Sequence, residues 1–336
     1  MSAPILVWGA GAIGGTLAVA FARAGEEVVL VDQAEDHVAA IRAGGLRIAG
    51  PIFEDTRPFA AFTPGELEGR FARVFLSVKA HHTQAEVRAL APHLVEDGFV
   101  VSAQNGLNER VIAEVVGAAR TVGCFVNFGA DYLEPGLVHY SGRGAVVIGE
   151  LDGAGTERVA ALHALLRRFE PNAVLTDNIW GYLWGKLIYG GLLFATAVSE
   201  DSIADVLDDG AYRPVLTGLG REVAAVATAA NIRLEGFDGF DPGAFVPEAP
   251  AERTEKSFAD MVAHNRRSLK THSGIWRDLA IRKRPTEVDA QLGPIAETGR
   301  EVGVATPITT RLIDVIHDIE AGRRPIARAN LAALAA

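Results

Sequence analysis

The chain has 336 residues, of which 49% are hydrophobic, and a formal net charge of −10 at pH 7. This length allows two domains with a sizeable core, and the acidic balance without a basic patch argues against a nucleic-acid partner. The single cysteine, Cys124, excludes an internal disulfide framework and a multi-cysteine metal site, and it favours a reducing compartment. We expect no metal in this protein.

The longest apolar stretch covers residues 180–198, but Lys186 and four glycines interrupt it. It therefore falls short of a clean membrane span, and we expect a helix of a soluble protein without a membrane partner. The N-terminus has no basic region followed by a separate apolar segment and a cleavage site. The expected location is cytoplasmic.

The first half of the chain alternates short apolar runs with segments of helical spacing. Strands are predicted at residues 4–9, 27–32, 73–79, 99–104 and 121–128, and helices at 14–25, 35–45, 83–90 and 109–116. A hairpin is predicted over residues 136–150. This alternation indicates a Rossmann-type, doubly wound sheet with parallel strands at its centre.

The second half of the chain reads as helical, with almost no strand signals. An amphipathic helix is predicted at 155–169, and long helices follow at 182–198, 212–231, 252–271, 288–302 and 306–321. The Pro/Gly-rich residues 235–250 form a predicted long loop that could border an active site. We therefore predict a dinucleotide-binding α/β domain over residues 1–177 and an all-α domain over residues 178–336, for substrate and dimerisation.

A glycine fingerprint follows the first predicted strand and opens the first helix. It reads Gly9-x-Gly11-x-x-Gly14, with Ala12 and Ile13 between the last two glycines. Glycines of this spacing let the backbone turn sharply and approach a pyrophosphate, which then lies at the helix N-terminus. In this strand–turn–helix context the motif predicts a bound dinucleotide.

Asp32 ends the second predicted strand, 18 residues after Gly14. An acid at this position accepts hydrogen bonds from the adenosine ribose hydroxyls and repels a 2′-phosphate, which favours NAD over NADP. The alternative is that Asp32 only opens a turn. Arg42 and Arg47 lie further along and could still serve a phosphate, so NADP stays open.

The chain resembles the ketopantoate reductase (2-dehydropantoate 2-reductase) family. The matching pieces are distributed over nearly the whole chain, and their order and spacing carry the resemblance. They are the glycine fingerprint, SVKAHHT, QNG, PGLVHYSGRGAVVIG, WGKL before ATA, and SGIWRDLAIRKRPTEVD. The resemblance implies a Rossmann domain, a helical C-terminal domain, and a cleft that binds a nicotinamide and a 2-oxo acid; a homodimer is a further expectation.

The same resemblance implies roles for five residues. Lys79 and Asn105 match family residues near the cofactor, and Asn105 also serves the substrate. Lys186 matches the catalytic lysine, and Glu287 a glutamate of the site that contributes to catalysis and cofactor binding. Ser273 matches a substrate-binding serine. Alternatives from the residues alone are a surface lysine at 79, an Asn-Gly turn at 105, and a helix capping box formed by Thr286 and Asp289 around Glu287.

Two positions depart from the family pattern. The family commonly has asparagines four and eight residues after the lysine, where this chain has Gly190 and Phe194. Both positions fall roughly on the face of the helix that carries Lys186. We therefore expect Gly190 and Phe194 to line a substrate pocket that is less polar and differently shaped, which puts ketopantoate itself in doubt.

Lys186 is the candidate proton donor. Reduction of a ketone creates a developing alkoxide, and a lysine in an apolar cleft can donate a proton to it or stabilise its charge. The alternative is structural, with the stem on apolar surface and the ammonium group reaching water or a carboxylate.

Three functions are open from the sequence. The first is hydride transfer between NAD(P) and a 2-oxo or 2-hydroxy acid. The second is a hydroxy-acid or opine-type dehydrogenase with a bulkier, more apolar substrate, which Gly190 and Phe194 favour. The third is a non-catalytic dinucleotide sensor, against which Lys186, Asn105 and Glu287 argue together.

Overall fold

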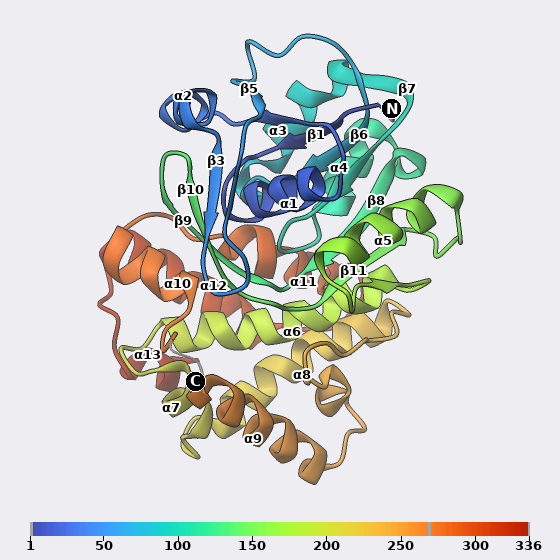
Figure 1. Ribbon diagram of the computed structural model, residues 1–336. Coiled ribbons are helices and arrows are strands. Elements are labelled where there is room, and N and C mark those ends of the chain that lie inside the picture. Colours follow the sequence, from blue (N-terminus) through green and yellow to red (C-terminus); the bar gives the residue numbers. More distant parts are fainter. Residues whose placement is uncertain (1–2, 268–269, 335–336) are drawn as a thin grey trace. The chain divides into compact units, whose positions relative to one another are not determined.

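The computed structural model describes residues 3–267 and 270–334. The chain divides into two compact units, Met1–Ile179 and Trp180–Ala336 (Figure 1). An α/β unit is followed by a helical one, which confirms the predicted fold class.

The first unit contains an eight-stranded sheet. Its strands are β1 (Ile5–Trp8), β2 (Val28–Val31), β5 (Ala60–Phe62), β6 (Phe71–Leu76), β7 (Leu94–Ser102), β8 (Thr121–Val126), β11 (Val146–Glu150) and β12 (Val174–Leu175). The order across the sheet is β12-β11-β8-β7-β6-β1-β2-β5. All neighbours from β5 to β8 pair in parallel, whereas β11 pairs antiparallel with β8. Strand order reverses between β1 and β6, and in such sheets this switch point is where ligands bind.

Helices connect the parallel strands, as the alternating pattern predicts. They are α1 (Ala12–Arg23), α2 (Glu35–Gly44), α3 (Thr83–Leu90), α4 (Asn108–Val116) and α5 (Glu157–Phe169). The α5 helix shows how the sequence encodes them. Thr156 caps its first turn by accepting a hydrogen bond from the Val159 N–H, and its apolar residues at helical spacing are buried.

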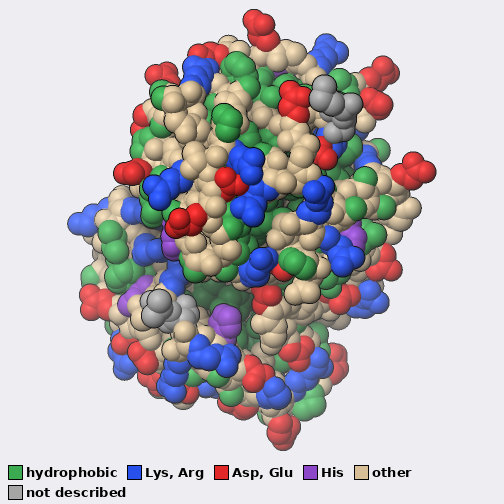
Figure 2. Space-filling model, viewed as in Figure 1, with side chains coloured by type: hydrophobic (Ala, Val, Ile, Leu, Met, Phe, Trp, Pro, Cys, Tyr) green, Lys and Arg blue, Asp and Glu red, His purple; other side chains and the backbone are tan. Residues whose placement is uncertain are grey.

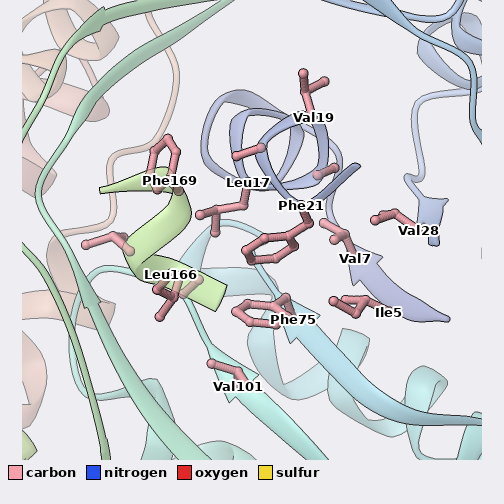
Figure 3. Packing of buried hydrophobic residues seen from close by; sticks show 14 of the residues in the cluster. Ile5, Val7, Leu17, Val19, Phe21, Val28, Phe75, Val101, Leu166 and Phe169 are labelled. Carbon is pink, nitrogen blue, oxygen red and sulfur yellow. The ribbon is translucent and has the colours of Figure 1, made fainter. Parts of the chain in front are cut away.

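The largest core of this unit surrounds α1. Figure 3 shows Leu17 and Phe21 of that helix among side chains of the sheet and of α5. The rings of Phe21 and Phe75 lie 4.8 Å apart with an interplanar angle of 55°, a favourable tilted contact. This packing fixes α1 on the sheet, and with it the glycine turn that precedes the helix.

A second sheet was not predicted, and the predicted hairpin over residues 136–150 is wrong. The four-stranded sheet has the order β4-β3-β10-β9, with strands β4 (Asp55–Arg57), β3 (Leu46–Ala49), β10 (Leu137–Gly142) and β9 (Gly129–Glu134). The β10 strand pairs with β9 and β3, whereas β11 belongs to the large sheet. The two consecutive strands therefore lie in different sheets. Local alternation of apolar and polar residues predicts a strand, but it does not determine which other strand will pair with that strand.

The second unit is helical. It contains α6 (Ile179–Ala197), whose first residue closes the first unit, α7 (Ile203–Asp208), α8 (Arg213–Ala229), α9 (Ala251–Arg267), α10 (Gly274–Arg277), α11 (Val288–Val302), α12 (Pro307–Glu320) and α13 (Ala329–Ala333). The five long helices begin and end within a few residues of the predicted ones. The predicted helix 252–271 extends over residues 268–269, which lie outside the described residues.

The predicted loop 235–250 packs its aromatic side chains against α6 and α9. Phe240 lies 5.3 Å from Tyr189 of α6, and Phe245, in a 3₁₀ turn, lies 5.6 Å from Phe258 of α9, between ring centroids. The loop also passes close to α6 at Gly185, where an added Cβ would meet the Glu235 carbonyl oxygen at 2.4 Å. This loop is thus part of the core of the second unit.

The predicted capping box around Glu287 is wrong. Glu287 itself occupies the N-cap position of α11, and its side chain makes no capping hydrogen bond with the helix. Thr286 donates its backbone N–H and its hydroxyl to Glu320 of α12, at 2.7 and 2.8 Å. The N–H and hydroxyl groups of Thr286 therefore bind the distant carboxylate of Glu320 and not the neighbouring residues that the local pattern predicted.

None of the described helices combines the length and the apolar character that crossing a bilayer requires. On the face shown in Figure 2, basic and acidic side chains are interspersed.

Candidate active site

The glycine turn after β1 has the geometry of a dinucleotide-binding loop. Gly9 has φ of +97°, which only glycine adopts readily, and an added Cβ would lie 2.9 Å from the backbone of Ser77 and Val78. At Gly14 an added Cβ would lie 1.9 Å from the Gly9 carbonyl oxygen. These two glycines allow α1 to pack closely on the sheet.

Gly11 differs from these two glycines, because an added Cβ there meets no atom within 4 Å. It is the cap residue of α1, and no side chain caps the helix. Ala12 and Ile13, like Gly11, are partly exposed at this end of α1. An uncapped first turn beside open space fits a dinucleotide pyrophosphate, because helix N–H groups and the helix dipole favour an anion there.

Two side chains hold the Ala10 peptide inside this turn. Asp32 accepts a hydrogen bond from the Ala10 N–H at 2.8 Å and one from the Ala34 N–H at 3.0 Å. His37 is buried, with its Nε2 2.9 Å from the Ala10 carbonyl oxygen and its Nδ1 2.9 Å from the Gly136 N–H. Because the Gly136 N–H donates to Nδ1, the proton is on Nε2, which donates to Ala10. The sequence analysis missed His37. The only signal for it in the sequence is its position in the first turn of α2, shortly after Asp32.

Lys79 and Asn105 follow the carboxyl ends of the neighbouring strands β6 and β7. Gln104 ties their segments together, since its Nε2 donates to the Val78 carbonyl and to the Thr83 hydroxyl, both at 2.8 Å. Lys79 is exposed and Asn105 half-buried. The first unit therefore brings both candidate residues to the same edge of the sheet.

Asn108 extends this network to the turn that carries Asn105. Its side-chain oxygen accepts from the Thr83 hydroxyl at 2.7 Å, and its Nδ2 donates to the Asn105 carbonyl at 2.6 Å. Gly106 turns the chain with φ of +98°. Asn105 thus lies in a turn held by buried side-chain hydrogen bonds, and Asn108 is a positioning residue that the sequence analysis missed.

Glu109 is a buried carboxyl group in the first turn of α4, directly after Asn108. Its exposed fraction is 0%. Burial raises the pKa of Glu109 to about 8, and neither carboxyl oxygen has a hydrogen-bond partner among the described residues. Near pH 7 this side chain is therefore mostly protonated and neutral.

In the second unit, Lys186 and Gly190 lie one turn apart on α6. Lys186 is half-buried in a helix that is otherwise almost entirely apolar. An added Cβ at Gly190 would meet one atom within 4 Å, Oε1 of Gln291 on α11, at 3.6 Å. Glu287, half-buried, precedes Gln291 by one helical turn, and the Gln291 N–H donates to its carbonyl.

Phe194 and Ser273 have structural contacts of their own. Phe194 is completely buried within α6. Ser273, 6% exposed, caps α10 by accepting from the Trp276 N–H at 3.1 Å.

Gly190 lacks the amide that the family commonly has at this position. In the structure the side-chain amide of Gln291 lies beside Gly190 instead.

The sheet topology and the glycine turn define a Rossmann-type, dinucleotide-binding protein. Residues 5–153 match the family described as ketopantoate reductase PanE/ApbA, and residues 178–320 match its C-terminal domain. The chain belongs to the ketopantoate reductase family and is an NAD(P)-dependent, 2-dehydropantoate 2-reductase-like oxidoreductase.

Relatives match along nearly the full length of the chain. A 2-dehydropantoate 2-reductase of Halobacterium salinarum is 29% identical, over 93% of this chain and 97% of its own. The ketopantoate reductase structure from Ralstonia eutropha JMP134 is 26% identical with a TM-score of 0.78, covering 95% and 99% of the two chains. A D-mandelate dehydrogenase, solved with NADH and anilino(oxo)acetate, shares the fold with a TM-score of 0.81 at 23% identity, covering 95% and 99%.

Proposed function

We propose that this protein transfers hydride between a nicotinamide dinucleotide and a 2-oxo or 2-hydroxy acid, with Lys186 as the proton donor. The observation that carries the proposal is the placement of Lys186. The residue is half-buried on an apolar helix, one turn from a glycine that leaves space beside it. A lysine at this place can donate a proton to a substrate oxygen held beside the apolar helix.

The nicotinamide supplies the hydride when the dinucleotide is bound, and the protein supplies binding, orientation and the proton. Gly9, Gly11 and Gly14 form the turn for the pyrophosphate. Lys186 donates the proton to the carbonyl oxygen as negative charge develops there, and in the oxidative direction it accepts that proton back. Lys79, Asn105 and Glu287 orient cofactor and substrate.

Asp32 selects NAD(H) over NADP(H) in this proposal. Both of its oxygens already accept backbone N–H groups, but each has a further lone pair for a ribose hydroxyl. A 2′-phosphate at the same place meets a carboxylate, and the repulsion of like charges weakens its binding.

A second candidate is a hydroxy-acid or opine-type dehydrogenase with a bulkier substrate. Gly190 favours it, because the absence of a side chain there leaves room that an asparagine would fill. A dinucleotide sensor without turnover is a weaker candidate, since a sensor has no use for a proton donor at Lys186.

Turnover on a substrate panel tests these candidates. NADH absorbance is followed with small 2-oxo acids, ketopantoate, phenylglyoxylate and 2-oxo acids with amines, and NAD⁺ reduction with the corresponding hydroxy acids. Turnover of small 2-oxo acids supports the first candidate, and a preference for bulky or amine-dependent substrates supports the second. Dinucleotide binding without turnover on any member supports the sensor.

We also propose a homodimer. A ketopantoate reductase of Staphylococcus aureus with the same fold, at a TM-score of 0.72 and 16% identity, is described as dimeric. Light scattering after size-exclusion chromatography measures the mass, and a value near the 35.6 kDa of one chain would contradict the dimer.

A further inference from the structure

Gln291, on α11 beside Gly190, carries a polar group without a described partner. The side-chain amide of Gln291 makes no hydrogen bond with residues 3–267 or 270–334. The residue is only partly exposed. Its oxygen faces the space left by the missing side chain of Gly190. An amide with unused donors and acceptor, beside space that no side chain fills, can bind a polar group of a ligand.

Packing does not require the glycine at this place. An added Cβ at Gly185 would collide with the Glu235 carbonyl oxygen at 2.4 Å, so the fold requires glycine there. At Gly190 the nearest atom would be at 3.6 Å, an ordinary contact distance, so alanine would fit. Glycine in a helix interior is less favourable than alanine. The space beside Gln291 is therefore not explained by the packing of α6.

The contact also has a defined position relative to the proposed proton donor. Lys186 precedes Gly190 by four residues on α6, and residues four apart lie on one face of a helix, about 6 Å from each other. If the carbonyl oxygen of the substrate meets Lys186 and its side chain extends along this face of α6, the far end of that side chain lies near Gly190. The amide of Gln291 would then face that end.

We propose that Gln291 is a specificity-determining residue that hydrogen-bonds an oxygen-bearing group on the side chain of the 2-oxo acid. This inference rests on the proposed function and names the part of the substrate that the enzyme reads. In this chain the amide is that of Gln291 on α11, whereas the family commonly has an asparagine at position 190 on α6. The NH₂ group of Gln291 donates to a hydroxyl oxygen of the substrate, or its Oε1 accepts from the hydroxyl.

A matched pair of substrates isolates this contact. Ketopantoate and 3,3-dimethyl-2-oxobutanoate differ by one hydroxyl group at the end of the side chain. The measured quantity is the ratio of kcat/KM for the hydroxylated acid to that for its partner, with NADH. Parent protein is compared with Gln291→Leu, and Glu297→Leu is the control, because Glu297 is exposed on the same helix.

We expect a ratio above 1 in the parent and a roughly 3- to 10-fold fall in Gln291→Leu, the range of one neutral hydrogen bond. Glu297→Leu should leave the ratio unchanged. Adding Gly190→Asn to Gln291→Leu should restore part of the ratio, because it supplies an amide from the opposite side of the gap. NADH affinity and melting temperature of each variant show that the fold and the cofactor site persist.

The possible failures are distinguishable. If the parent reduces no 2-oxo acid, the proposed function fails and the role of Gln291 falls with it. If the parent reduces both acids but Gln291→Leu leaves their ratio unchanged, the proposed function stands and the role of Gln291 is overturned. A fall in Gln291→Leu that is equal for both acids also overturns it, since the contact would then serve the common 2-oxo acid group or the fold.

Discussion

Asp32 accepts a hydrogen bond from the backbone N–H of Ala10 at 2.8 Å, so the acid at the end of β2 holds the middle of the glycine turn after β1. In the proposed function this carboxylate has two tasks, shaping the loop for the pyrophosphate and facing the adenosine ribose. Substitutions at Asp32 will therefore change cofactor affinity as well as cofactor preference.

We expect the parent protein to bind NADH more tightly than NADPH. Asp32→Asn should narrow this difference, because the charge that repels a 2′-phosphate is lost while one oxygen can still accept the Ala10 N–H. Asp32→Ala should narrow it too, but weaken both cofactors, since the Ala10 N–H loses its acceptor. Fluorescence titration at equal ionic strength measures all these affinities, and tighter NADPH binding by the parent would contradict the assignment.

The glycines of the fingerprint should respond differently to alanine. Gly11→Ala places a methyl group in open space, so the melting temperature should stay near the parental value while dinucleotide affinity falls. Gly14→Ala places a methyl group 1.9 Å from the Gly9 carbonyl oxygen and should destabilise the protein by several kcal/mol. Thermal melting and NADH titration of both variants check this, and unchanged NADH affinity in Gly11→Ala would place the pyrophosphate elsewhere.

Replacement of Lys186 separates the catalytic from the structural explanation. Lys186→Ala and Lys186→Met should both lose turnover by about 10²–10⁴-fold, the usual contribution of a general acid, and keep NADH affinity. Lys186→Met retains an unbranched apolar stem, so it should melt at or above the parental temperature. Steady-state kinetics on the substrate found by the panel decide the matter. Near-parental turnover in Lys186→Met would leave this lysine with a structural role only.

Glu109 should make stability depend on pH. Its pKa is raised from 4.5 to about 8, so between these values the folded protein retains a proton that the unfolded chain has released. The free energy of unfolding should therefore fall as pH rises through this window, by about 1.4 kcal/mol per unit from this group, and level off above about pH 8.

Glu109→Gln removes this titration and should flatten the pH dependence between pH 5 and 8, while raising stability at the alkaline end. Urea unfolding at several pH values measures the effect. Glu114→Gln is the matched control, because Glu114 is exposed on the same helix and should leave the slope as in the parent. An unaltered slope in Glu109→Gln would show that the carboxyl group is ionised in the folded protein.

Much of the fold could be predicted because its signals are local. The period of apolar residues predicted α3 and α11 to the residue and α1 within two residues at each end, and the strand–turn–helix context of Gly9, Gly11 and Gly14 indicated a dinucleotide. These features depend on neighbours within one or two turns of the chain, which the sequence displays directly.

The rest depends on contacts between segments far apart in the chain. Residues 137–142 and 146–150 read as one hairpin, but the first strand pairs with residues 129–134 and with the remote residues 46–49, whereas the second pairs with β8 in the other sheet. The same holds for His37, whose ring accepts from a backbone N–H 99 residues away, and for Gln291, which acquires its significance only by facing Gly190. Local patterns of residues were sufficient for the long helices, the central parallel strands, the family and the candidate residues, but not for the strands of the second sheet. Which polar groups meet follows only from the folded structure, because distant contacts, unlike local periodicity, leave no regular spacing in the sequence.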